Sequence, residues 1–189
     1  MEQDFDVSKL VPFAIFLLGI AFSPTIEWLK EKSKAKRLRN LVISSLSDEH
    51  ERMKDAIEFT IQTINIIEKS GKNILRLHSP INIKVLERYY LDIYPEITKE
   101  QRMGFNCLML QINSIEEKYS FIKNNWKDEE TSTLIIKIKS MLHSVILTEF
   151  FLYEMSKQKS RFKFPKQNDN EIIYSVLARY NITDNGYLI

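Results

Sequence analysis

Residues 98–126 read TKEQRMGFNCLMLQINSIEEKYSFIKNNW, and this stretch has the cleanest helical pattern in the chain. Thr98, with Gln101 three residues later, predicts a capping box at its start. The apolar residues that follow alternate spacings of three and four over about three heptads, which is typical of a narrow seam in a helical bundle. Gly104 either lets a neighbouring segment approach closely or is simply tolerated. The seam consists of Phe105, Leu108, Ile112, Ile115, Tyr119, Ile122 and Trp126.

The composition agrees with a helical fold. The 189 residues are 44% hydrophobic and 28% charged, a balance that excludes wholesale disorder. Only 4 Gly and 5 Pro are present, whereas β-sandwiches and doubly wound folds usually use more glycine in their turns. We therefore predict an all-α protein: an N-terminal transmembrane helix followed by a cytosolic bundle of about four or five helices.

Helix signals also flank the seam. On the N-terminal side, a serine-rich break at residues 44–47 predicts that Ser47 caps a new helix, which Gly71 ends. Ser79 followed by Pro80 predicts the cap and first position of the next helix. On the C-terminal side, Asn168 with Glu171 predicts the capping box of a last helix.

The helix predicted after residue 128 is apolar on more than one face. Such a helix is normally central, packed on both sides or shared with another subunit. We therefore consider part of this surface a candidate oligomer interface, formed by Ile138, Met141, Val145 and Leu152.

Residues 10–29, LVPFAIFLLGIAFSPTIEWL, are the most informative stretch for localisation. No charge occurs before Glu27, which leaves roughly 17 residues, the lower limit for crossing a ~30 Å hydrocarbon layer. Trp28 follows where an interfacial aromatic anchor belongs. We predict a transmembrane helix here. Its anchoring residues are Leu10, Phe13, Phe16, Leu17, Leu18, Ile20, Phe22 and Trp28.

A basic run follows the apolar stretch and predicts the orientation. Cationic flanks stay in the cytoplasm, so the N-terminus should face out of the inner (plasma) membrane, with the rest of the chain inside. The same cations can lie along anionic headgroups, or they can form a solvated helix face. They are Lys30, Lys32, Lys34, Lys36, Arg37 and Arg39.

The alternatives for the apolar stretch differ in strength. A cleaved signal peptide is disfavoured because the first nine residues carry three acids and one lysine. A buried or oligomerising helix of a soluble protein stays open, since the stretch is short. The predicted division is an acidic tail (1–9), the transmembrane helix (10–29), a basic juxtamembrane helix (30–46), the bundle (47–182) and a C-terminal tail (183–189).

Residues that carry chemistry are sparse. A single cysteine, Cys107, excludes an intramolecular disulfide and fits a reducing compartment. His50, His78 and His143 lack a second His or Cys at metal-binding spacing. Glu149 is six residues from His143, so the two lie on different faces of one helix. No phosphate loop or catalytic signature occurs, and we expect no enzymatic activity, no cofactor and no metal.

A second basic run, at residues 157–166, contains two phenylalanines and no acid. Basic residues with interleaved aromatics are able to bind an anionic ligand: a nucleotide, a nucleic-acid strand or a lipid headgroup. The alternative is that the first two lysines cap a helix while Phe162 and Phe164 pack on the bundle. The candidate ligand-binding residues are Lys157, Lys159, Arg161, Lys163 and Lys166.

Together these features favour a membrane-anchored helical effector that oligomerises and passes its state to the membrane helix. An antiphage-type bacterial effector has this architecture, an analogy without a shared motif. The alternatives are a passive membrane-tethered scaffold or adaptor, and a soluble helical sensor of a nucleotide ligand. The predicted partners are the lipid bilayer, further copies of this chain, and a protein partner or nucleotide.

Overall fold

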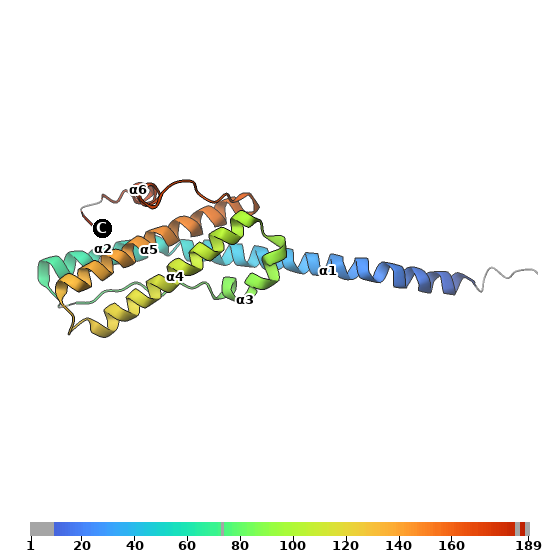
Figure 1. Ribbon diagram of the computed structural model, residues 1–189, viewed down its shortest axis with the longest axis horizontal. Helices are drawn as coiled ribbons and strands as arrows, with labels where there is room; N and C mark the ends of the chain where they lie inside the picture. The colour runs from blue at the N-terminus through green and yellow to red at the C-terminus, as the bar shows by residue number, and fades with distance from the viewer. Residues whose placement is uncertain (1–9, 73, 184–185, 188–189) are drawn as a thin grey trace, which may run out of the picture.

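A computed structural model describes residues 10–72, 74–183 and 186–187, and these residues are helical with no strand. Figure 1 shows a bundle from which one long helix projects. This confirms the all-α prediction. The α-helices are α1 (Leu10–His50), α2 (Met53–Ser70), α3 (Lys84–Ile93), α4 (Lys99–Asn125), α5 (Thr131–Gln158) and α6 (Asp169–Arg179), with 3-10 turns η2 (Tyr94–Glu96) and η3 (Lys159–Arg161).

Helix α5 is the centre of the bundle. It packs against α1, α2, α4 and α6, so most of its apolar side chains are covered by the chain itself, although Ile136 stays exposed. The four residues predicted as an oligomer interface are therefore core residues in this fold. Ile138, Met141, Val145 and Leu152 are all 0% exposed. Of the alternatives that the sequence left open for this wide apolar surface, the structure shows a central helix whose buried residues are covered by the chain itself.

Helix α4 follows the predicted seam. Thr98 and Gln101 form the capping box, with the Thr98 hydroxyl accepting from the Gln101 amide and the Gln101 side chain accepting from the Thr98 amide. Six of the seven seam residues are buried, and Tyr119 is half-buried. Gly104 permits a close approach, because a Cβ there would lie 2.8 Å from a ring carbon of Phe162. The structure thus resolves the alternative that the sequence left open.

Helix α1 is one continuous helix of 41 residues, about 60 Å long at 1.5 Å per residue. The predicted break at residues 44–47 is wrong. Val42, Ile43 and Leu46 are buried against the bundle, and this packing carries the helix through the serines to His50. The helix also runs without interruption from the segment 10–29 into the segment 30–46.

The apolar N-terminal half of α1 lies beyond the bundle (Figure 1). Within the residues that the structure describes, no helix is long and apolar enough to cross a membrane. The predicted transmembrane helix at residues 10–29 is thus not supported by the described residues. The side chains of Leu10, Phe13 and Leu17, three of the predicted anchors, lie outside them.

Other boundaries differ from the predictions where tertiary packing decides them. Helix α2 begins after Arg52, with no side-chain cap, because α1 extends past Ser47. Helix α3 begins at Lys84 and not at Pro80, since His78 and Ile81 are buried as part of an irregular connector. The capping box of Asn168 and Glu171 is confirmed at the start of α6.

Parts of the two predicted tails lie outside the described residues: 1–9, 184–185 and 188–189. Two residues of the C-terminal tail contact the bundle. The Tyr187 hydroxyl lies 3.1 Å from the Asn65 amide nitrogen, and Lys139 donates to the carbonyl of Gly186. Residues 186–187 therefore lie against α2 and α5.

Candidate functional site

The exposed apolar surface of α1 is the largest feature that the fold does not use. In residues 11–29, nine large hydrophobic side chains are between 49 and 64% exposed. Isolated exposed hydrophobics are ordinary, but a contiguous set of this kind marks a surface that a partner covers. These side chains are Val11, Ile15, Phe16, Leu18, Ile20, Phe22, Ile26, Trp28 and Leu29.

The first basic run follows directly on the same helix. Lys30, Lys32, Lys34, Lys36 and Arg37 are exposed, and Arg39 is half-buried near the bundle. The Lys32 ammonium lies 4.8 Å from the centre of the Trp28 ring, a cation–π distance. The helix thus changes over a few residues from an apolar surface to a cationic one. Its aromatic residue lies at the boundary, as the sequence predicted.

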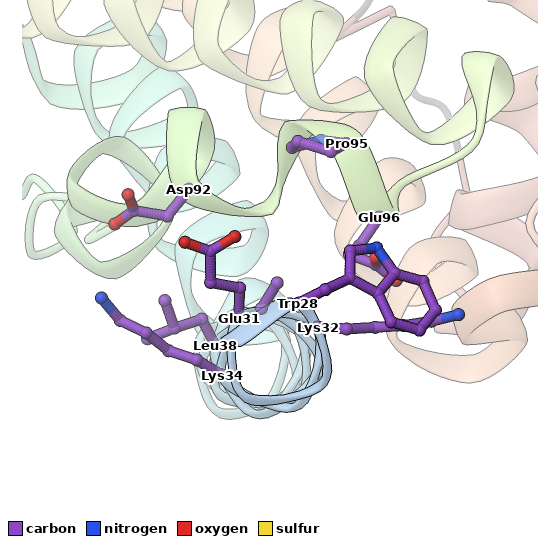
Figure 2. A pocket seen from close by; sticks show the side chains of 9 residues that line it. Trp28, Glu31, Lys32, Lys34, Leu38, Asp92, Pro95 and Glu96 are labelled. Atoms are coloured by element: carbon purple, nitrogen blue, oxygen red, sulfur yellow. The ribbon is translucent and has the colours of Figure 1, made fainter. Parts of the chain in front are cut away.

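A pocket lies where this boundary meets the bundle. Figure 2 shows Glu31 and Lys34 of α1 on the side of Asp92 of α3, and Trp28 and Lys32 on the side of Glu96 of η2, with Pro95 above. The pocket has a volume of about 350 Å³ and carries both signs of charge. Glu31 extends from α1 on the same side of the pocket as Asp92, so the lining combines two lysines with three carboxylates.

The other end of α1 is held by a buried charge. Glu149 of α5 is 0% exposed, and three side chains converge on its Oε1 atom. Arg179 donates from Nη1 at 2.6 Å, Tyr180 donates its hydroxyl at 2.8 Å, and His50 Nε2 donates at 3.0 Å. Because His50 is the last residue of α1, this carboxylate joins α1, α5 and α6 at one point.

The surroundings of Glu149 are also polar. The Arg179 guanidinium stacks on the ring of Tyr153 at 3.7 Å, and Lys157 donates to the Tyr153 hydroxyl at 2.7 Å. Burial, together with the negative charge of Glu149, raises the pKa of the Tyr180 phenol. Tyr180 therefore stays a hydrogen-bond donor at neutral pH, as the cluster requires.

Sequence reasoning missed this cluster. It correctly found that His143 and Glu149 do not pair, but it did not bring His50 or Arg179 to Glu149. Those partners are 99 and 30 residues away, so no helical spacing relates them. One signal was present: a glutamate in an otherwise apolar helix needs a cationic partner when the helix is central.

The second basic run lies on the surface at the end of α5 and in the segment before α6. Its five cations, Lys157, Lys159, Arg161, Lys163 and Lys166, are exposed. Phe162 is 2% exposed against Gly104, and Phe164 packs against Phe151. Both phenylalanines thus pack on the bundle, which is the alternative to ligand binding that the sequence analysis gave for these two residues. Whether the cations bind an anion stays a prediction.

The histidines occupy three separate places. His50 bonds Glu149, His78 lies buried in the connector, and His143 is half-buried on α5. Across residues 10–72, 74–183 and 186–187, no three His, Cys, Asp or Glu side chains form a group that could hold a metal ion. The chain matches no protein-family model, no curated protein and no solved structure.

Proposed function

We propose that this protein is a membrane-attached effector: the apolar N-terminal half of α1 inserts into the bilayer, and the bundle stays at the cytoplasmic surface. The observation that carries the proposal is the run of nine exposed hydrophobic side chains that project beyond the bundle. Burial of an apolar side chain stabilises by about 25 cal/mol per Å² removed from water, so an uncovered run of this kind favours a lipid environment.

The dimensions and charges agree with insertion. The uncharged residues 10–26 rise about 25 Å along the helix, at the lower limit for a hydrocarbon core ~30 Å thick. Trp28 and the cations that follow it then lie at the level of the headgroups, where each cation contributes about 1 kcal/mol near an anionic surface. No helix among the described residues is long and apolar enough to cross a membrane, so the proposal rests on the exposed hydrophobic side chains of α1.

The effector part of the proposal rests on the continuity of α1. One helix runs from the exposed apolar surface to His50, where it ends on the Glu149 cluster in the bundle core. A rearrangement of α5 or α6 would therefore act directly on the end of the membrane helix. A single inserted helix cannot line a pore, so disturbance of the membrane would require several copies that meet along α1.

Flotation with vesicles tests the attachment. The full chain is mixed with vesicles of equimolar phosphatidylcholine and phosphatidylglycerol, and we expect it to float with the lipid. Leu18→Glu places a charge in the centre of the apolar surface and should leave the protein in the unfloated fraction. The matched control is Leu110→Glu, because Leu110 is 67% exposed on the bundle and Leu18 is 54% exposed on α1.

Other outcomes favour the alternatives. A chain that does not float but forms Leu18-dependent oligomers would be the soluble helical sensor. A chain that floats but leaves the membrane potential intact when overexpressed would be the passive scaffold. A reporter active only in the cytoplasm, fused to the C-terminus, should give signal; its loss when the six cations at residues 30–39 are changed to Gln would support the orientation.

A further inference from the structure

The second basic run, at residues 157–166, is held in place on the start of α4. The carbonyl oxygen of Lys159 accepts a hydrogen bond from Gln101 Nε2 at 3.0 Å, and the amide of Phe164 donates to Glu100 Oε2 at 2.8 Å. Phe162, between these two anchors, is 2% exposed. The backbone and the aromatic side chains thus fix the segment, while its five cations stay exposed.

Most cations of the run are left unpaired by the chain. No Asp or Glu occurs in residues 155–168. The Lys157 ammonium donates to the Tyr153 hydroxyl at 2.7 Å. A fixed group of exposed and unpaired cations attracts an anionic partner. Within the part of the chain that the structure describes, four side chains of the run form no ion pair and no hydrogen bond: Lys159, Arg161, Lys163 and Lys166.

Lys159 also has an unusual backbone conformation, with φ 52° and ψ −120°. Residues other than glycine rarely adopt a positive φ, because the Cβ atom crowds the backbone. Strained residues of this kind cluster at ligand-binding and switch regions. The chain thus carries a lysine where the turn alone would favour glycine, and the position gains a cation at a cost in backbone energy.

The run lies at the end of the bundle from which α1 projects. Figure 1 shows the end of α5 and the start of α4 at this end, on the same side as the exposed half of α1. The turn η2, which precedes α4, lines the pocket beside Trp28. The two basic runs, 30–39 and 157–166, are far apart in the sequence, but the fold brings them to the same end of the bundle.

We propose that this end of the bundle docks on the anionic headgroups of a bilayer, with the cations of residues 157–166 in contact with lipid phosphates. The proposal rests on the proposed function, because the attachment of α1 places this end of the bundle closest to the membrane. Cations are attracted to an anionic surface over about one Debye length, roughly 8–10 Å. A second contact at the end of α5 then fixes the tilt of the bundle against the membrane.

The packing of the phenylalanines disfavours another anionic partner, a nucleic-acid strand. Proteins that bind single strands stack the bases on accessible aromatic side chains. In this run Phe162 is buried, and Phe164 packs against Phe151 with the ring centres 5.8 Å apart. The run therefore offers charge without a stacking surface, which suits headgroup phosphates.

Lysine footprinting on the unaltered chain tests the contact. The full chain is acetylated with and without vesicles of equimolar phosphatidylcholine and phosphatidylglycerol, and mass spectrometry measures the modification of each lysine. Three lysines of the run should react at least about threefold more slowly when headgroups cover them: Lys159, Lys163 and Lys166. Three exposed lysines at the opposite end of the bundle, where α2 and α4 end, should be unaffected: Lys69, Lys123 and Lys127.

Matched variants test the contribution to binding. The triple variant Lys159→Gln, Lys163→Gln and Lys166→Gln should bind these anionic vesicles at least about tenfold more weakly, since each cation near the surface contributes to binding. The control variant makes the same change at the three lysines of the opposite end and should alter binding less than about twofold. Neither variant should change binding to pure phosphatidylcholine vesicles. Equal losses in the two variants would contradict the contact.

The emission of Trp28, in a Trp126→Phe chain, separates this proposal from the proposed function. A blue shift with vesicles but no protection of the three lysines would overturn the contact alone. Neither shift nor protection would overturn both proposals. Protection without a shift would support the contact and contradict the insertion of α1. A triple variant that loses affinity for a single-stranded oligonucleotide, but not for the anionic vesicles, would assign the run to nucleic acid and overturn the proposal.

Discussion

Helices α1 and α5 are both long and rich in apolar residues, but the chain covers α5 along most of its length and α1 only in its C-terminal half. Helix α5 is enclosed by α1, α2, α4 and α6, and its buried side chains make up a large part of the core. The N-terminal half of α1 extends away from every other element (Figure 1). An apolar pattern thus predicts that side chains are buried but does not say which surface buries them. The side chains of α5 are buried by other helices of this chain, and we propose that those of the N-terminal half of α1 are buried by a bilayer.

The largest expected effect comes from placing the same charged residue in each of the two helices and comparing the loss of stability. Leu152→Glu, in α5, buries a charge at a site with 0% exposure and should lower the free energy of unfolding by more than about 4 kcal/mol. Leu18→Glu, in α1, should change it by less than about 0.5 kcal/mol, because the site is solvated. Urea denaturation followed by circular dichroism measures both. Equal destabilisation would mean that the exposed half of α1 packs within the chain.

The second effect concerns the point where the two helices meet. Glu149→Ala removes the acceptor shared by Arg179, Tyr180 and His50. We expect a loss of about 2 to 3 kcal/mol, less than the full 3–5 kcal/mol for a broken buried pair because Arg179 and His50 keep some solvent contact. Hydrogen exchange should rise in residues 42–50. Exchange that rises only in α6 would show that the cluster does not hold α1.

A smaller effect compares two helical glycines. Gly104→Ala places a Cβ 2.8 Å from Phe162 and 3.0 Å from the Met155 sulfur, so overpacking should exceed the helix-propensity gain by about 1 kcal/mol. The Tm should fall by about 2–4 °C. Gly19→Ala is the control, because nothing lies within 4 Å of its Cβ position. An unchanged Tm for Gly104→Ala would mean that Phe162 does not pack against α4.

The smallest effect is a pH dependence of the bundle. Burial lowers the pKa of His78 and of His143 in the folded state. Below about pH 6.5, the ordinary pKa of a histidine, the unfolded chain therefore binds more protons than the folded chain. The stability is therefore full above that pH and declines as the pH falls toward 5. His78→Phe should reduce the difference in urea midpoint between pH 7 and pH 5. An unaltered difference would assign the pH dependence to other groups.

The sequence predicts the bundle well where local patterns decide the structure. The seam of α4 and both capping boxes are confirmed because each depends on residues within one or two helical turns. The predicted break at residues 44–47 does not occur, because buried contacts of Val42, Ile43 and Leu46 outweigh the weak helix propensity of serine. The start of the next helix was predicted at Pro80 but lies at Lys84, because packing of the connector decides where α3 begins.

The candidate sites were less predictable, and the reason is distance along the chain. The exposed surface of α1 and its basic run follow from adjacent residues, and the sequence finds both. The partners of Glu149 and the neighbours of the second basic run come from segments that only the fold brings together. No periodicity relates residues 157–166 to the start of α4 or to α1, so the location of this run at the end of the bundle becomes visible only in three dimensions.

The most direct test of membrane insertion uses Trp28 as a reporter. The chain has two tryptophans, and the variant Trp126→Phe leaves Trp28, which is 56% exposed, as the one fluorophore of this kind. On addition of equimolar phosphatidylcholine and phosphatidylglycerol vesicles, we predict a blue shift of its emission, because the indole leaves water for the headgroup region. Leu18→Glu should abolish the shift. Insertion would be contradicted if the emission stays at its value in buffer when the lipid concentration is high enough for proteins that bind anionic membranes to float with the vesicles.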